Sequence, residues 1–263
     1  MRPAAALAAL VALLLAAPPA GAAPNCRLAL ALALDVSSSV DAREYELQRA
    51  GVAAALAAPE VRHAILSGSA GHVALAVFEW SGFDQHELQL DWTVLATPAD
   101  IDRAVRTLVG MARSHDDFPT SMGSALGYAA TLLRRGPRCA RQVIDVSGDG
   151  VNNYRFGPRE AYRHFPFDGV TVNGLVITGD DPQVLPFYAG EVLHGPGAFL
   201  VVADGYAAFR EAMTRKLFRE VNDIVLGMAA DMTAHGKTDL AADLAADPAA
   251  ARGPHPPPPS RTR

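Results

Sequence analysis

One segment near the start of the chain joins a buried strand to a cluster of oxygen-bearing side chains. Residues 28–41 read LALALALDVSSSVD: seven apolar residues run directly into a carboxylate, Asp35, and then into three serine hydroxyls. Side chains alternate between the faces of a strand, and Asp35 stands where this strand runs out. Asp35, Ser37 and Ser39 can therefore converge on one point as the backbone turns into a helix near Asp41.

Apolar runs of strand length alternate with amphipathic stretches of helix length along the whole chain, which is typical of a parallel sheet covered by helices on both faces. The strands are predicted at Leu28–Asp35, His72–Trp80, His86–Val94, Arg141–Ser147, Val170–Ile177 and Ala198–Ala203. The helices are predicted at Ala42–Ala58, Pro98–Met111, Met122–Arg135, Pro158–His164, Pro182–Leu193 and Tyr206–Ala234.

The linker between the second and third strands is the short segment 81–85, SGFDQ, which predicts a hairpin with one antiparallel edge strand. The remaining strands should be parallel. We therefore expect an α/β fold over residues 23–235: a doubly wound, mostly parallel six-stranded sheet with one antiparallel edge strand and helices on both faces.

Both ends of the chain differ in composition from this domain. Residues 1–22 contain one Arg, an apolar run and a break at proline, which predicts a secretory signal peptide. The run is shorter than the ~20 residues that span a bilayer, so we expect no transmembrane anchor after cleavage and an exported protein, periplasmic or secreted. Residues 236–263 are rich in Ala and Pro, which predicts a disordered tail.

The charge of the chain argues against a nucleic-acid partner. The formal net charge is −5, and the sequence contains no run of Lys or Arg that would form a basic patch.

Three short oxygen ligands on one tight turn suit a hard cation. Magnesium and manganese prefer carboxylate, hydroxyl and water, and the absence of Cys and His from the turn argues against zinc or copper. The alternative is that Ser39 or Asp41 only caps the following helix, as such residues commonly do.

Two other segments favour the cation. FPTSMGSAL places Thr120 just before an apolar helix, and VIDVSGDGVNN places Asp149 just after an apolar strand. In a doubly wound sheet, the first strand and the strand after the crossover are neighbours where the strand order reverses, and ligands bind at their carboxyl ends. We therefore expect Asp35 and Asp149 to face one pocket.

Together these residues resemble the metal-ion-dependent adhesion site of von Willebrand factor type A domains. The matching residues, in the order that the family has them, are Asp35, Ser37 and Ser39, then Thr120 with Gly123, then Asp149 and Gly150. The resemblance extends over roughly residues 27–225. DVSSSVD and SGDGVNN further resemble a group of exported bacterial proteins that carry this domain and have no assigned function.

The resemblance implies that Ser37, Ser39 and Thr120 supply hydroxyl ligands and that Asp35 and Asp149 bind the ion directly or through water. It implies Mg²⁺, or Mn²⁺ or Ca²⁺, as the ion, and a partner protein whose Asp or Glu carboxylate binds that ion. We expect an adhesion-type domain with no catalytic residue, not an enzyme. Two alternatives stay open. A metal-dependent hydrolase would need a general base that the ligand loops do not supply, and a degenerate site would bind no metal.

The two cysteines of the chain, Cys26 and Cys139, are predicted to form a disulfide. Cys26 lies nine residues before Asp35, and Cys139 lies eight before Ser147, so on adjacent parallel strands the two thiols start at the same level. An oxidising compartment would permit their pairing. Lipid attachment at Cys26 is the less favoured alternative, because a lipoprotein signal has small residues directly before the cysteine and Pro24-Asn25 stand there.

Overall fold

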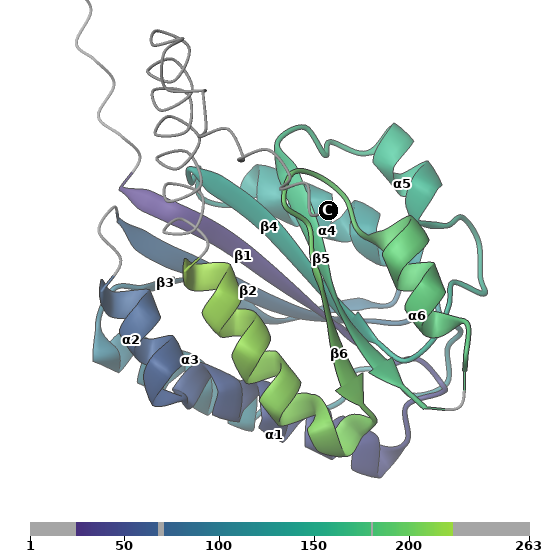
Figure 1. Cartoon of the computed structure of the whole chain (residues 1–263), viewed down its shortest axis with the longest axis horizontal. Helices are drawn as coiled ribbons and strands as arrows, with labels where there is room; N and C mark the ends of the chain where they lie inside the picture. The colour runs from purple at the N-terminus through teal and green to yellow at the C-terminus, as the bar shows by residue number, and fades with distance from the viewer. Residues whose placement is uncertain (1–24, 68–70, 180, 223–263) are drawn as a thin grey trace, which may run out of the picture.

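The computed structural model of the chain describes residues 25–67, 71–179 and 181–222. Six strands form one sheet in the order β3-β2-β1-β4-β5-β6 (Figure 1). They are β1 Cys26–Asp35, β2 His72–Trp80, β3 His86–Leu95, β4 Arg141–Gly148, β5 Val170–Thr178 and β6 Leu200–Asp204. The edge strand β3 is antiparallel to β2, and the other neighbouring strands are parallel. The predicted fold, with its hairpin and antiparallel edge strand, is confirmed.

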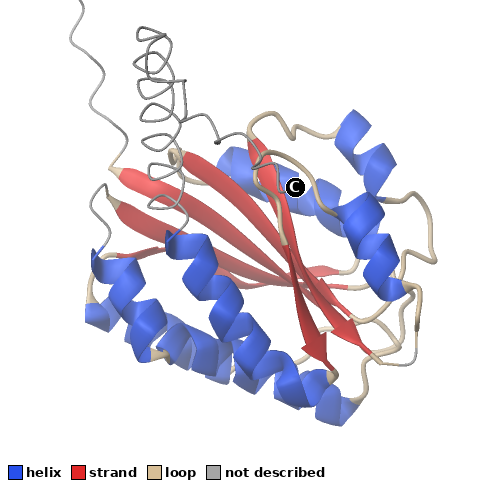
Figure 2. Ribbon diagram, in the orientation of Figure 1, coloured by secondary structure: helices blue, strands red, loops and turns tan. Residues whose placement is uncertain are grey.

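Helices cover both faces of the sheet (Figure 2). One layer consists of α1 Ala42–Ala57, α2 Pro59–Ser67, α3 Pro98–Val109 and a last described helix over residues 206–222, which begins with the 3₁₀ turn Tyr206–Ala208. The other layer consists of α4 Met122–Arg135, α5 Pro158–His164, α6 Val184–Phe187 and the π-helical turn Tyr188–Val192.

The central strand β1 is buried on both faces because it lies between β2 and β4 and under both helix layers. Its leucines, at the even positions 28–34, pack into the core beneath α1, α2 and α3. Its alanines, at the odd positions 29–33, pack into the core beneath α4. Strand alternation then places Asp35 on the alanine side, at the end of the strand.

The helix α2 is a correction to the sequence analysis, which predicts no helix at Pro59–Ser67. Ala58 has φ −59° and ψ 134°, the extended conformation that a following proline favours. Pro59 then begins α2, where its missing N–H costs no hydrogen bond. The proline therefore separates two consecutive helices.

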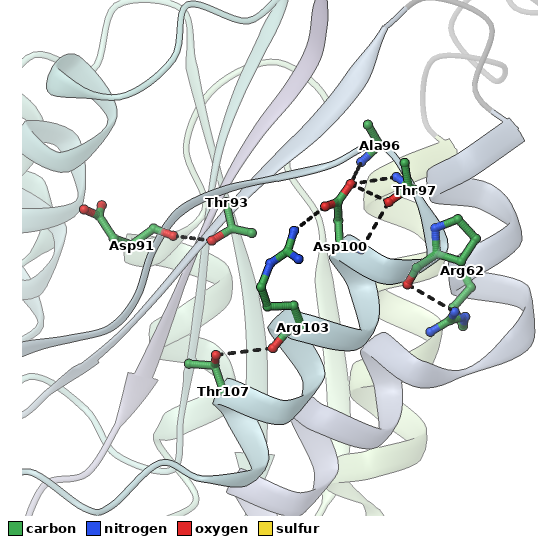
Figure 3. Close-up of polar contacts among 9 residues, drawn as sticks. Arg62, Asp91, Thr93, Ala96, Thr97, Asp100, Arg103 and Thr107 are labelled. Carbon is green, nitrogen blue, oxygen red and sulfur yellow. Dashed lines mark hydrogen bonds and ion pairs between the residues drawn. The ribbon is translucent and has the colours of Figure 1, made fainter.

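A capping box begins α3 (Figure 3). The Asp100 carboxylate accepts a hydrogen bond of 2.9 Å from the Thr97 N–H, and the Thr97 hydroxyl accepts one of 3.3 Å from the Asp100 N–H. In the same view, Arg62 of α2 donates to the carbonyl of Pro98 at 3.5 Å. These contacts fix the start of α3 beside α2.

Other element bounds differ from the predictions by a few residues. The predicted helix 182–193 consists of α6 and the π-helical turn, and the last strand begins at Leu200. The predicted signal peptide 1–22, the tail 236–263 and residues 223–234 of the last predicted helix lie outside the described residues. Among the helices that are described, none is long and apolar enough to cross a membrane.

The amino-terminal end of β1 is fixed by a disulfide and a buried arginine. Cys26 and Cys139 form the predicted disulfide, with their Cα atoms 4.6 Å apart. The Arg27 guanidinium is buried and donates to the carbonyls of Ala64 at 2.7 Å and Val221 at 2.6 Å. At the end of α2, this cation also compensates the negative end of the helix dipole.

Candidate functional site

The five residues predicted as metal ligands lie together at the carboxyl ends of β1 and β4. The Thr120 hydroxyl donates to Ser37 Oγ at 3.2 Å, and Ser37 Oγ lies 3.2 Å from Ser39 Oγ. Ser39 Oγ donates to Asp149 Oδ1 at 2.9 Å, and Asp35 Oδ1 accepts from the Ser37 N–H at 2.8 Å. Three loops that are far apart in sequence thus meet in one chain of hydrogen-bonded oxygens.

The helix-capping alternative applies to Asp41 but not to the serines. The Asp41 carboxylate accepts from the Glu44 N–H at 2.8 Å, and the Glu44 carboxylate accepts from the Asp41 N–H at 2.8 Å. This capping box accounts for the start of α1. Ser37 and Ser39 are therefore not needed as caps, and their hydroxyls point to the other oxygens of the site.

The site contains a buried carboxylate, Asp35, whose charge the surrounding protein groups do not fully compensate. Asp35 is fully buried, and its Oδ2 atom has no hydrogen-bond partner among the described residues. Burial, and secondly the nearby carboxylate of Asp149, raise the pKa of Asp35 to about 7. Two carboxylates and three hydroxyls with one buried oxygen unsatisfied fit a hard divalent cation. Elsewhere, no group of three or more His, Cys, Asp or Glu side chains that could hold a metal occurs within the described ranges.

Arg113 positions the turn that carries Ser37 and Ser39, and the sequence analysis did not single it out. Its guanidinium donates to the carbonyls of Val36 at 3.0 Å, Ser37 at 3.1 Å and Val40 at 2.7 Å. It also lies over the Tyr45 ring, 5.9 Å from the centroid. One cation thus satisfies three carbonyls of the turn. No local sequence signal reveals this, because the contacts span more than 70 residues.

Tyr188 is a second residue that sequence reasoning missed. It is fully buried in the π-helical turn, and its hydroxyl has no partner among the described residues. A Cβ atom on Gly148 would lie 2.8 Å from both Tyr188 Oη and Asp35 Oδ2, and one on Gly174 would lie 2.8 Å from the Tyr188 ring. Two strand glycines therefore make room for Tyr188, and its hydroxyl borders the unsatisfied oxygen of Asp35.

A pocket of about 330 Å³ opens beside the oxygen cluster. Ser39, Thr120 and Asp149 line its inner side, and Glu44 and Asp181 add further carboxylates to its wall. The sequence predicts that Asp35 and Asp149 face one pocket. Asp149 lines this pocket, whereas Asp35 is buried next to it and does not line it.

Asn153 connects the Thr120 loop to the loop after β4. Its Oδ1 atom accepts from the Thr120 N–H at 2.9 Å, and its own N–H donates to the Thr120 carbonyl at 3.0 Å. The second asparagine of this loop, Asn152, accepts from the Gly123 N–H at 3.4 Å. These two side chains fix where Thr120 and Asp149 lie relative to each other.

Solved structures with the same fold are distant in sequence. Proximal thread matrix protein 1 (PTMP1) from the mussel byssus, in a structure with a zinc-occupied MIDAS motif, has a TM-score of 0.56 and 12% identity over 75% of this chain and 48% of its own. The von Willebrand factor type A protein from Catenulispora acidiphila has a TM-score of 0.53 and 17% identity, and the match covers 75% of this chain and 43% of that protein. The pilus adhesin SpaC from Lactobacillus rhamnosus GG has a TM-score of 0.55 and 12% identity, and the match covers 75% of this chain and 31% of that protein.

The chain spans less than half the length of each of these three proteins. Because their sequence identity to this chain is low, the similarity shows the fold alone, which is that of a von Willebrand factor type A domain. A sequence search of curated proteins finds no match. A family model described as "Protein of unknown function (DUF1194)" matches residues 25–225. The chain therefore belongs to the DUF1194 family, which in this protein has the von Willebrand factor type A fold.

Proposed function

We propose that this protein is an adhesion-type domain that binds one divalent cation and, through it, a carboxylate of another protein. The observation that carries the proposal is the buried, unsatisfied Oδ2 atom of Asp35 behind a chain of hydroxyls that leads to Asp149. Mg²⁺ is the expected ion, with Mn²⁺ or Ca²⁺ as substitutes. A structural neighbour with a zinc-occupied MIDAS motif supports a divalent ion, and a neighbour that is a pilus adhesin supports protein binding.

The residues have distinct roles in this proposal. Ser37, Ser39 and Thr120 supply neutral oxygens, and Asp35 and Asp149 supply charge, directly or through water. Bound there, the ion would supply a Lewis-acidic centre that keeps waters and an exchangeable position. Thr120 and Asp149 line the pocket and Asp35 is buried, so the exchangeable position of the ion would be reached from the pocket.

Binding a partner is favoured over hydrolysis. A metal-dependent hydrolase needs a base that is free to take a proton from water. Glu44 and Asp181 line the pocket, but each carboxylate already accepts a backbone N–H, from Asp41 and from Gln183. We also propose that the protein acts outside the cytoplasm, where the Cys26–Cys139 disulfide persists.

Metal binding is tested by calorimetric titration of the full chain with MgCl₂ and MnCl₂. Asp149→Ala should weaken binding by about tenfold or more, because it removes a charged ligand worth at least about 1.4 kcal/mol. Asp168→Ala is the matched control, since Asp168 is exposed and lies at the opposite end of the sheet. Circular dichroism checks that both variants fold. Equal affinity of the two variants would refute this ligand set.

The open position is tested with Mn²⁺ and the relaxation of water protons. Acetate should displace Mn²⁺-bound water from the wild-type protein and lower the relaxation enhancement, whereas acetamide, its neutral analogue, should not. An enhancement that is insensitive to acetate at saturating concentration would show that the ion takes no carboxylate.

A further inference from the structure

Three large aromatic side chains are exposed beside the oxygen cluster. Phe83, Phe118 and Tyr154 are 37%, 37% and 40% exposed, and they come from three different loops. A Cβ atom on Gly82 would lie 3.3 Å from Phe118 Cβ, so Phe118 adjoins the turn that carries Phe83. Exposed apolar side chains that gather in one place mark interaction surfaces.

Arg155 joins two of these rings. Its guanidinium carbon lies 5.2 Å from the ring centroid of Phe83 and 5.3 Å from that of Tyr154. The residue is exposed and forms no ion pair with another described residue. Its charge is therefore presented to solvent between two rings. We call Phe83, Phe118, Tyr154 and Arg155 the aromatic rim.

The backbone of Arg155 is strained. Its φ of +60° is the one positive φ of a non-glycine residue in the described ranges. A left-handed conformation costs an L-residue with a long side chain about 1–2 kcal/mol, and such strain concentrates at functional sites. A glycine or asparagine would avoid this cost, but neither would place a guanidinium between the rings.

The rim is fixed directly to the loops of the candidate site. The Phe118 carbonyl accepts from the Ser38 N–H at 2.9 Å, and the Tyr154 N–H donates to the Thr120 carbonyl at 3.2 Å. The rim therefore lies on the Thr120 side of the oxygen cluster. Carboxylates of Glu44 and Asp181 line the pocket itself. Further exposed carboxylates flank the rim in sequence, Asp84 next to Phe83 and Asp116 and Asp117 before Phe118. Arg155 is thus a cation on a surface that is otherwise rich in carboxylates.

We propose that the aromatic rim is a second binding surface for the same partner, a protein segment with a large apolar residue and a second acidic residue next to the carboxylate that binds the ion. This inference rests on the proposed function. The apolar side chain packs on Phe83 and Phe118, and the second carboxylate pairs with Arg155. Arg155 is the cation of the rim, so a second carboxylate of the segment is attracted there. The carboxylates around the site, among them Glu44 and Asp181, disfavour a nucleic-acid backbone.

Capped synthetic pentapeptides serve as probes, because they isolate each feature of the proposed segment. The reference peptide is Gly-Asp-Phe-Glu-Gly. One analogue replaces Phe by Ala, a second replaces Glu by Gln, and a third replaces Asp by Asn. Binding to the full chain loaded with Mn²⁺ is read from water-proton relaxation. The first two analogues should bind about fivefold more weakly than the reference. The third keeps only the Glu carboxylate for the ion, so it should lose the contribution of the rim and bind no more tightly than acetate.

Two rim variants test which residues are responsible. Arg155→Asn removes the charge with a residue that tolerates the left-handed conformation, so the fold should be at least as stable as that of the wild type. Phe118→Ala removes one ring. Both should keep the wild-type affinity for Mg²⁺. Arg155→Asn should abolish the preference for Glu over Gln, and Phe118→Ala should reduce the preference for Phe over Ala. Phe218→Ala, a control at another exposed aromatic residue, should change neither preference.

The outcomes separate the rim from the metal site. If acetate and all peptides that contain Asp displace water equally well, the rim plays no part and the proposed function stands. If neither acetate nor any peptide displaces water, the carboxylate-binding function fails and the rim proposal falls with it. Unchanged preferences in both rim variants would overturn the assignment of these residues.

Discussion

Replacing Asp145 by Asn should change how the stability of the protein depends on pH. Asp145 lies in β4 beneath the last described helix, and it is buried together with Lys216 and Glu220 of that helix. Lys216 Nζ lies 3.0 Å from Asp145 Oδ2 and 3.0 Å from Glu220 Oε1. Asn173 of β5 also donates to Glu220 Oε1, at 2.8 Å. Two carboxylates thus share one ammonium group in a site without solvent.

Burial raises the pKa of Asp145 from 3.8 to about 7, because the attraction of Lys216 only partly offsets the loss of solvation and Glu220 adds repulsion. The folded protein therefore holds a proton that the unfolded chain releases near pH 4. The resulting stability is present at low pH and is lost as the pH rises toward 7. Proton linkage with these two pKa values gives a loss of about 3 kcal/mol between pH 5 and pH 8.

Urea unfolding of the wild-type protein and of D145N at several pH values between 5 and 8 measures this effect. Asn cannot ionise, so the stability of D145N relative to wild type should increase by about 3 kcal/mol over this range. The comparison cancels the contribution of the titrating groups that do not interact with Asp145, whereas Lys216 and Glu220 titrate together with it. Asp168→Asn, at an exposed carboxylate, should show no such trend. Parallel pH profiles for D145N and wild type would refute the proposed burial of a protonated Asp145.

Two further predictions concern the disulfide and Tyr188. Replacing both cysteines by serine should lower the free energy of unfolding by about 3–5 kcal/mol, because the disulfide joins residues 113 positions apart in the unfolded chain; a loss below about 1 kcal/mol in urea unfolding would contradict this. Tyr188→Phe should raise the free energy of unfolding by about 1 kcal/mol while circular dichroism stays native, because it removes a buried hydroxyl that has no hydrogen-bond partner among the described residues. A loss of stability in urea unfolding would show that this hydroxyl does find a partner.

The sequence predicts the sheet because its strands depend on local patterns, and the resemblance to von Willebrand factor type A domains supplies the set of five oxygen donors. The run that ends at Asp35 and the run before Asp149 have the length and apolarity of buried strands. The short hairpin predicts the pairing of β2 with β3, and the crossover predicts that of β1 with β4. The disulfide follows from the same adjacency, since β1 and β4 start at the same level.

The groups that orient the site were not predicted because their contacts are not local. Arg113 stands in a polar loop and contacts carbonyls 73 to 77 residues away. Tyr188 is an aromatic residue in a short helical segment, and its position depends on two glycines in β4 and β5. The helix α2 was missed for a different reason: Pro59 both ends one helix and begins the next, and the sequence shows only the break.

The turn that carries Ser37 and Ser39 is held by protein groups, so we expect it to form without an ion. Arg113 binds its carbonyls, the Asp41 capping box fixes the helix that follows, and the disulfide and Arg27 fix the far end of β1. A bound cation then stabilises the fold only by mass action, about 2.7 kcal/mol at a hundredfold excess over its Kd. The unsatisfied oxygen of Asp35 lowers the stability of the free protein, and the pre-formed turn keeps this oxygen unpaired. This arrangement favours the binding of an ion and of a partner carboxylate, at the expense of the stability of the fold.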